Sequence, residues 1–183
     1  QSKYYRVDGS STQNKGVLPD IELLSTWDIE SVGESSYPTA LEWDTIRPYR
    51  HKKFNFDSNQ IIEIKNLYSQ RLNSSPNLKY LGEVRDRYYL NKDKKLLSLN
   101  LDTRKLEKDA RKNWLLQIEN KRRESLGLEI FGTYEDLEES NKKNENTNND
   151  IDYERDYLLI ESTNIINDYL NLNKLLISKV NKL

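Results

Sequence analysis

The stretch DTRKLEKDARKNWLLQIENKRRESLG, residues 102–127, decides the fold class of this chain. Its apolar residues recur at steps of four, which is the spacing of one face of an α-helix. They are Leu106, Ala110, Trp114 and Ile118. Asp102 is suited to cap the start of this helix, and Gly127 is placed to end it. The pattern predicts a long amphipathic helix with Trp114 in the core.

Three further helices are expected around it. The first is capped by Asp57 or Ser58, the second begins at Ser75 followed by Pro76, and the last is capped by Asp152. Their apolar faces are Ile61, Ile64, Tyr68 and Leu72; Leu78, Leu81, Val84 and Tyr88; and Leu158, Ile165, Tyr169, Leu172 and Leu176. The sequence therefore predicts a mainly α region of about four helices, with the wide face of the last one docked on the others.

The segments between these helices differ in composition. Leu97 and Leu99 alternate with polar residues, which favours a short strand or an extended link. Residues 128–137 are expected to form a loop, and residues 138–150 contain no apolar side chain. Such a segment cannot bury enough surface to offset the entropy of ordering, so a flexible linker is expected near 138–150.

The N-terminal stretch YYRVDGSSTQNKGVLPDI, residues 4–21, has a different character. Tyr5 and Val7 alternate with polar residues, which predicts a short strand, and Gly9 permits a turn after it. Residues 17–21 are expected to be extended as well, because Leu18 precedes a proline. The fold class expected is α+β: an N-terminal strand or extended segment followed by a helical domain.

Charge and composition exclude several classes of protein. The chain has 29 basic and 30 acidic residues and a net charge of -1, which argues against a dedicated nucleic-acid binder. It has no cysteine, so disulfides and thiolate metal sites are excluded. No apolar run approaches the roughly 20 residues that span a bilayer. The chain begins with glutamine and contains no methionine, so we expect a processed or excised piece of a longer protein.

Three motifs resemble one family in its own order. Residues 4–21 resemble the segment that closes the catalytic domain of C-terminal processing proteases, the tail-specific serine endopeptidases of bacteria. Residues 40–46 resemble the run that follows it, with Glu42 where the family usually has proline. Residues 97–100, with Arg104 and Glu107, resemble the helical C-terminal extension of that family.

The resemblance implies a domain plan and an activity. Residues 1–25 would close the protease catalytic domain, residues 26–56 would be a connector, and residues 57–183 would form the helical C-terminal domain. The whole enzyme would be a periplasmic serine–lysine endopeptidase that needs no cofactor. Its substrates would be proteins recognised by their apolar C-terminal tails. Its partners would be those substrates and its own catalytic domain, and the resemblance leaves open an adaptor or a homo-oligomer.

No catalytic, metal or cofactor residue is expected in this chain itself. Ser10, Ser11 and Lys15 imitate a serine–lysine pair, but they match the closing segment, and nothing in the sequence would desolvate Lys15. The family's lysine lies in an upstream Gly-Lys-Gly motif that is absent here. His51 is the only histidine, and neither metal-ligating partners nor a nucleophile stand near it.

Two other interpretations stay open. The chain could be a stand-alone helical protein-interaction module that carries the same segment. It could also bind nucleic acid through residues 79–95 and 104–123, which would make binding fall steeply with salt. If the chain is a stand-alone interaction module, no protease would be encoded in the same gene.

Overall fold

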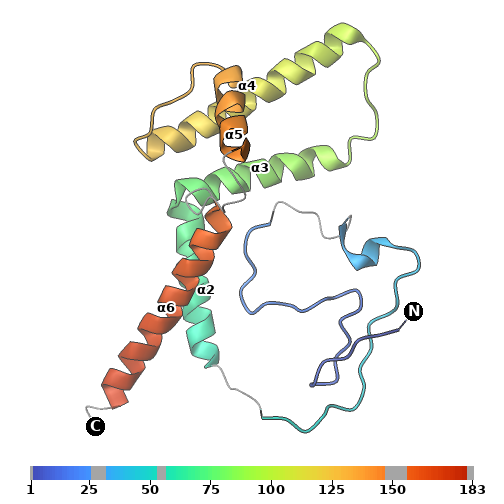
Figure 1. Ribbon diagram of the computed structural model, residues 1–183, viewed down its shortest axis with the longest axis vertical. Helices are drawn as coiled ribbons and strands as arrows, with labels where there is room; N and C mark the ends of the chain where they lie inside the picture. Colours follow the sequence, from blue (N-terminus) through green and yellow to red (C-terminus); the bar gives the residue numbers. More distant parts are fainter. Residues whose placement is uncertain (1, 26–31, 53–56, 147–155, 181–183) are drawn as a thin grey trace. The chain divides into compact units, whose positions relative to one another are not determined.

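The computed structural model describes residues 2–25, 32–52, 57–146 and 156–180, and these are mainly helical (Figure 1). The helices are α2 Ser58–Ser74, α3 Pro76–Lys92, α4 Leu101–Ser125, α5 Tyr134–Asn146 and α6 Tyr157–Val180. The chain divides into two compact units, one of Gln1–Leu67 with Tyr169–Leu183 and one of Tyr68–Asp168.

The first two helices begin where the sequence predicts. Asp57, one of the two expected caps, accepts the N–H of Asn59 at 2.9 Å before α2. Ser75 caps α3 by accepting the N–H of Leu78 at 3.4 Å, and Pro76 occupies the first helical position. Polar oxygens at these positions satisfy backbone donors that have no partner inside the helix.

The ends of α4 confirm one prediction and correct another. The cap is Asn100, whose side chain accepts the N–H groups of Asp102 and Thr103; Asp102 itself lies in the first turn. Gly127 ends the helix with a φ of 69°. Its N–H donates to Glu124 O, and the next N–H donates to Arg123 O, which is the Schellman arrangement.

Only the second half of α4 is buried. Ile118 is 6% exposed, whereas Leu106 is 70% exposed and Ala110 is exposed. Trp114, predicted to be core, is half-buried, with the guanidinium of Arg87 4.3 Å from its ring centroid. The reason is tertiary: α4 packs against α3 and α5 but extends beyond them. The helical period was correct, but it could not indicate how far the packing reaches.

Helix α5 replaces part of the predicted linker. Residues 138–146 are helical, so the prediction of a flexible linker is wrong for them, and residues 147–150 lie outside the described residues. Thr133 N–H donates to Asp136 Oδ2 at 2.9 Å, and Asp136 N–H donates to Thr133 Oγ1 at 3.2 Å. This reciprocal capping box starts the helix. Two i,i+4 pairs, Glu138–Lys142 and Glu139–Lys143, and the buried Leu137 support it.

Helix α6 contacts α2 through polar side chains, and the predicted docking of its wide apolar face stays a prediction. In one unit Gln60 donates to Asn173 at 3.0 Å, and in the other Arg71 donates to Glu161 at 2.7 Å, so the helices run antiparallel (Figure 1). Asp156 accepts the N–H of Leu159 at 2.9 Å and caps α6. The predicted cap, Asp152, lies outside the described residues.

The predicted N-terminal strand does not form in the described part of the chain. Residues 2–25 contribute only isolated bridges, between Tyr5 and Ser11 and between Ser10 and Thr45. A turn closes at Gly9, whose N–H donates to Arg6 O at 2.9 Å. The alternation of Tyr5 and Val7 is real, but a strand needs a continuous neighbour, and here each neighbour pairs over one residue.

Candidate functional site

A single carboxylate, Asp44, joins the N-terminal segment to residues 44–46. Asp44 accepts from Lys3 Nζ at 3.0 Å and from Tyr5 Oη at 3.2 Å. The bond from the Lys3 ammonium holds the pKa of Asp44 below its ordinary value, and the same pair raises the pKa of Lys3. Loss of surrounding water, followed by the bond to Asp44, raises the pKa of Tyr5. A paired carboxylate of low pKa fixes geometry and is a poor general base.

The two serines that imitate a nucleophile have other roles. Ser11 is 2% exposed, its Oγ accepts the N–H of Gln13 at 3.1 Å, and its own N–H donates to Asp44 O at 3.0 Å. Ser10 N–H donates to Asp8 Oδ1 at 3.0 Å. These bonds shape the turn. The bond from Ser10 N–H, against the loss of surrounding water, and a further bond from the Ser10 side chain hold the pKa of Asp8 below its ordinary value, so this carboxylate is a poor general base for the hydroxyl.

The ammonium group of Lys15 lies over the ring of Trp43. Its Nζ lies 3.7 Å from the centroid of the Trp43 ring. An aromatic face attracts the charged ammonium of a lysine, so Trp43 is a cation–π partner for Lys15. A lysine that acts as a general base is instead surrounded by groups that favour the neutral amine. Trp43, 38% exposed, therefore anchors residues 40–46 to the loop that carries Lys15.

His51 is exposed, and its Nδ1 lies 2.7 Å from Tyr49 O. Within the described ranges, no three histidine or acidic side chains gather in a way that could hold a metal ion.

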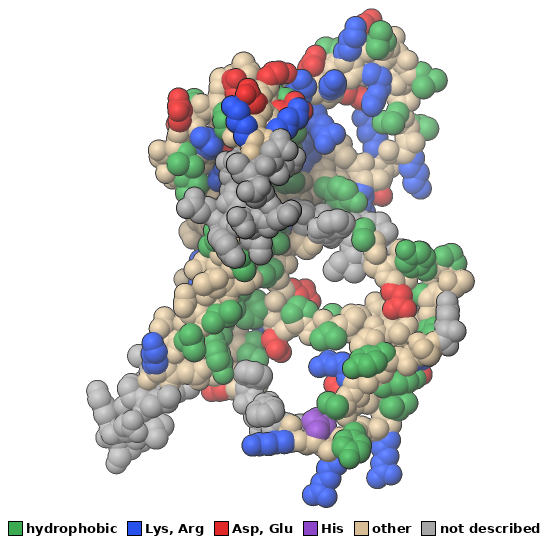
Figure 2. Space-filling model, viewed as in Figure 1, with side chains coloured by type: hydrophobic (Ala, Val, Ile, Leu, Met, Phe, Trp, Pro, Cys, Tyr) green, Lys and Arg blue, Asp and Glu red, His purple; other side chains and the backbone are tan. Residues whose placement is uncertain are grey.

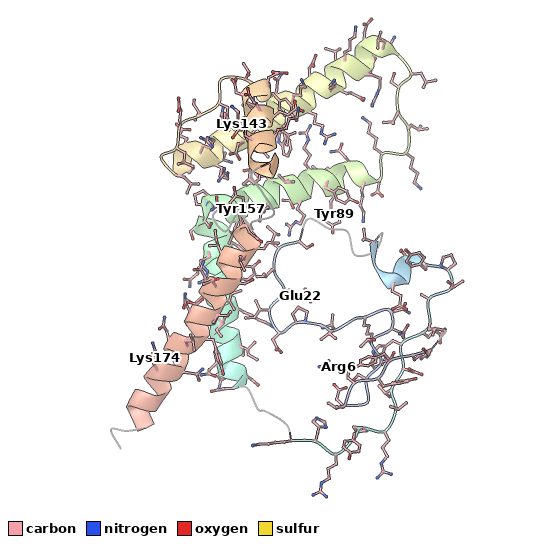
Figure 3. All side chains as sticks on the ribbon, viewed as in Figure 1. Arg6, Glu22, Tyr89, Lys143, Tyr157 and Lys174 are labelled. Atoms are coloured by element: carbon pink, nitrogen blue, oxygen red, sulfur yellow. The ribbon has the colours of Figure 1, made fainter. Side chains whose placement is uncertain are left out.

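The unit of Tyr68–Asp168 holds a polar cavity of about 270 Å³ that the sequence did not predict. It is lined by α3, α4, α5 and the start of α6, where Tyr157 lies (Figure 3). Six of the lining side chains interact with one another: Tyr80, Glu119, Arg122, Arg123, Phe131 and Tyr157. Glu119 is 7% exposed, so its charge is largely withdrawn from water and requires a partner.

Arg122 supplies that partner. Its Nη2 and Nε donate to the two Glu119 oxygens at 2.5 and 2.9 Å, and its Nη1 donates to Asn77 at 3.0 Å. The bond to Glu119 raises the pKa of Arg122, whose guanidinium lies 5.7 and 5.2 Å from the rings of Tyr80 and Tyr157. Burial, followed by the Glu119 charge, raises the pKa of Tyr80.

Arg123 completes the cavity wall. Its guanidinium lies 4.3 Å from the Phe131 ring centroid and donates to Glu129 O. Both arginines are thus satisfied within the chain, and the carboxylate between them is neutralised. The interactions that the structure shows around the cavity are those of a buried structural network, in which Glu119 and the two arginines bond to groups of this chain. The i,i+3 spacing of Glu119 and Arg122 was the one sequence signal for it.

Comparison with known proteins identifies the family. The family model described as "C-terminal domain of tail specific protease" matches residues 27–171. A tail-specific protease of Haemophilus influenzae is 30% identical over 175 residues, which is 93% of this chain. The chain therefore belongs to the family of C-terminal domains of tail-specific proteases. It spans 24% of the length of that relative.

Of the helices that the structure describes, none is both long and apolar enough to cross a membrane.

Proposed function

We propose that this chain is the non-catalytic C-terminal part of a serine endopeptidase whose serine and lysine lie in the remainder of the protein. The family match carries the proposal. It agrees with the geometry of the described residues, where Ser11 is buried in a turn and Lys15 lies on Trp43. The helical domain would position substrate at a catalytic centre that it does not itself contain.

The domain plan follows from the same assignment. Residues 1–25 would complete the catalytic domain, residues 26–56 would connect, and residues 57–183 would form the helical domain. The alternation of Tyr5 and Val7 would then be satisfied by a neighbouring strand that the catalytic domain supplies. Only such a neighbour would turn the isolated bridges of the N-terminal segment into a ladder.

The substrates we propose are proteins with apolar C-terminal tails, cleaved in the bacterial periplasm. The tail-specific name of the Haemophilus influenzae relative supports this class of substrate. No metal or cofactor is proposed, because acyl transfer by a serine and a lysine needs only a nucleophile, a base and oxyanion donors.

The test uses the full-length protein and an unfolded substrate with an apolar tail. Ser10→Ala and Lys15→Ala are introduced separately, and kcat/KM for cleavage is measured. We expect changes of no more than about twofold, because neither side chain would touch the reacting atoms. Removing a true nucleophile or base lowers kcat by factors on the order of 10⁴–10⁶.

A loss of that size in Lys15→Ala, with an unchanged circular dichroism spectrum, would place the base in this chain and overturn the assignment. A full-length protein that cleaves no such substrate would instead favour the stand-alone interaction module.

A further inference from the structure

The free end of the α3–α4 hairpin exposes a concentration of leucines. Leu90 is 83% exposed, Leu96 85%, Leu97 62%, Leu99 100%, Leu101 66% and Leu106 70%. Figure 2 shows hydrophobic side chains, interspersed with basic ones, over the end of α3, the link and the start of α4. We call these six leucines the leucine tip. Single exposed leucines are ordinary, but a cluster of six on one short stretch marks an interaction surface.

The backbone of the link is unpartnered as well. Among residues 95–99, which are all described, no backbone N–H or C=O bonds to another backbone group of the described chain. The residue that follows, Asn100, has extended dihedrals of -70° and 124°. Leu97 and Leu99 lie two residues apart, with Ser98 between them, which is the repeat of a strand. Exposed leucine side chains and backbone groups without a backbone partner in the described chain therefore lie on the same segment, residues 95–99.

A salt bridge fixes the link before any partner arrives. Glu107 on α4 accepts from Lys94 Nζ at 2.9 Å and from Arg104 Nη1 at 2.6 Å. The bond from Lys94 holds the pKa of Glu107 below its ordinary value. One carboxylate on α4 thus holds Lys94, the residue before the link, against the helix that follows the link. A segment held in place this way loses less conformational entropy on binding than a free loop does.

We propose that residues 95–99 add as a strand to an exposed sheet edge of the catalytic portion of the same polypeptide, with the leucine tip buried at that contact. Strand addition uses main-chain hydrogen bonds for affinity and pockets for alternate side chains for specificity. The inference rests on the proposed function, which supplies the catalytic portion.

Two observations favour this occupant over a lipid surface or a second copy. A lipid interior cannot bond free backbone N–H and C=O groups, whereas a sheet edge presents the complementary set. The chain spans 24% of the related tail-specific protease, so the remaining part of such a polypeptide is tethered to the tip. Tethering gives it an effective concentration of the order of millimolar that a second copy does not have.

The absence of cysteine in this chain makes a labelling test direct. Leu99→Cys is introduced into the full-length protein, and its rate of maleimide labelling is compared with the rate in urea. The matched control is Glu124→Cys, which is exposed near the C-terminal end of α4, and the protein without the new cysteine gives the background. We expect Cys at 99 to label about tenfold or more slowly in the folded protein, because only an opened state reacts. Cys at 124 should label at the unfolded rate.

The outcomes separate the possible occupants. Protection that is independent of protein concentration supports the intramolecular contact. Protection that rises with protein concentration identifies a second copy as the partner, and protection only with anionic vesicles identifies a lipid surface. Either result overturns the proposal. Labelling of the cysteine at the unfolded rate overturns it as well. Hydrogen exchange tests the strand itself: the amides of Leu97 and Leu99 should exchange slowly in the full-length protein. Fast exchange at these amides would overturn strand addition even if the side chain is covered.

Peptidase activity is measured on the same Leu99→Cys protein. Full activity with an unprotected cysteine would refute the contact and leave the proposed function intact. Protection in a protein that cleaves no substrate would refute the proposed function instead.

Discussion

At the scale of single residues, two glycines that look alike in sequence have unequal roles. Gly9 and Gly16 both have positive φ, 85° and 61°. A Cβ built on Gly16 would meet nothing within 4 Å, whereas one on Gly9 would lie 2.1 Å from the carbonyl oxygen of Ile46. The close approach arises because the turn at Gly9 bonds directly to residue 46: Ile46 N–H donates to Gly9 O at 2.8 Å.

We therefore predict different costs for the two alanine substitutions. Gly16→Ala should destabilise local structure by about 1–2 kcal/mol, the cost of the left-handed region alone. Gly9→Ala should cost roughly 3 kcal/mol or more, because a backbone atom must move. Hydrogen-exchange protection of the Ile46 amide measures both, as its acceptor is Gly9. Equal losses in the two variants would contradict the contact between the turn and residue 46.

At the scale of elements, α2 and α6 are joined by a buried ion pair. Glu161 is 3% exposed and receives Arg71 Nε at 2.7 Å, and Asn164 is a further side-chain donor to it at 3.3 Å. Arg71 Nη1 also lies 2.8 Å from Asp168, and these two carboxylates, against the cost of burial, raise the pKa of Arg71. The value of such a pair shows when one partner is removed, since the other stays buried and charged.

Arg71→Leu should lower the free energy of unfolding by about 2–3 kcal/mol, and the Arg71→Leu/Glu161→Leu double variant should recover most of that loss. Urea unfolding followed by circular dichroism gives the values. The control is Lys142→Leu on α5, whose pair with Glu138 is exposed; its effect should stay within about 0.5 kcal/mol. A double variant less stable than the single one would show that the pair stabilises the helices by more than mutual neutralisation.

At the scale of the whole molecule, charge is balanced and locally paired. The net charge is -1, and cations of α4 that could track phosphates are engaged with carboxylates, as Lys112 is with Glu135 and Lys121 with Glu83. We predict no binding of this chain to a short fluorescent DNA duplex at physiological salt, measured by anisotropy. Binding that weakens steeply between low and moderate salt would revive the nucleic-acid interpretation.

The sequence by itself determined the helical class, the start of α3, the end of α4 and the family. Caps and terminators are local, so Ser75, Pro76 and Gly127 could be assigned from their neighbours alone. The same local signals were present for α5, where Thr133 and Asp136 form a capping box, but the lack of apolar residues obscured them. The family that the motifs of residues 4–21 and 97–107 indicated was confirmed by comparison, since the family model matches residues 27–171 and the relative aligns over 93% of the chain.

Only the tertiary structure decided which apolar faces are covered. Ile118 is buried and Leu106 is exposed, although both belong to one stripe of four-residue steps. Each step turns about 40° further around the helix, so the two side chains lie about 120° apart, and α3 and α5 pack along only part of α4. Tertiary structure also brought Lys15 to Trp43 and enclosed Glu119 with Arg122. Periodicity reports the direction of a side chain, but burial depends on where other elements end, and that is a property of the packed chain.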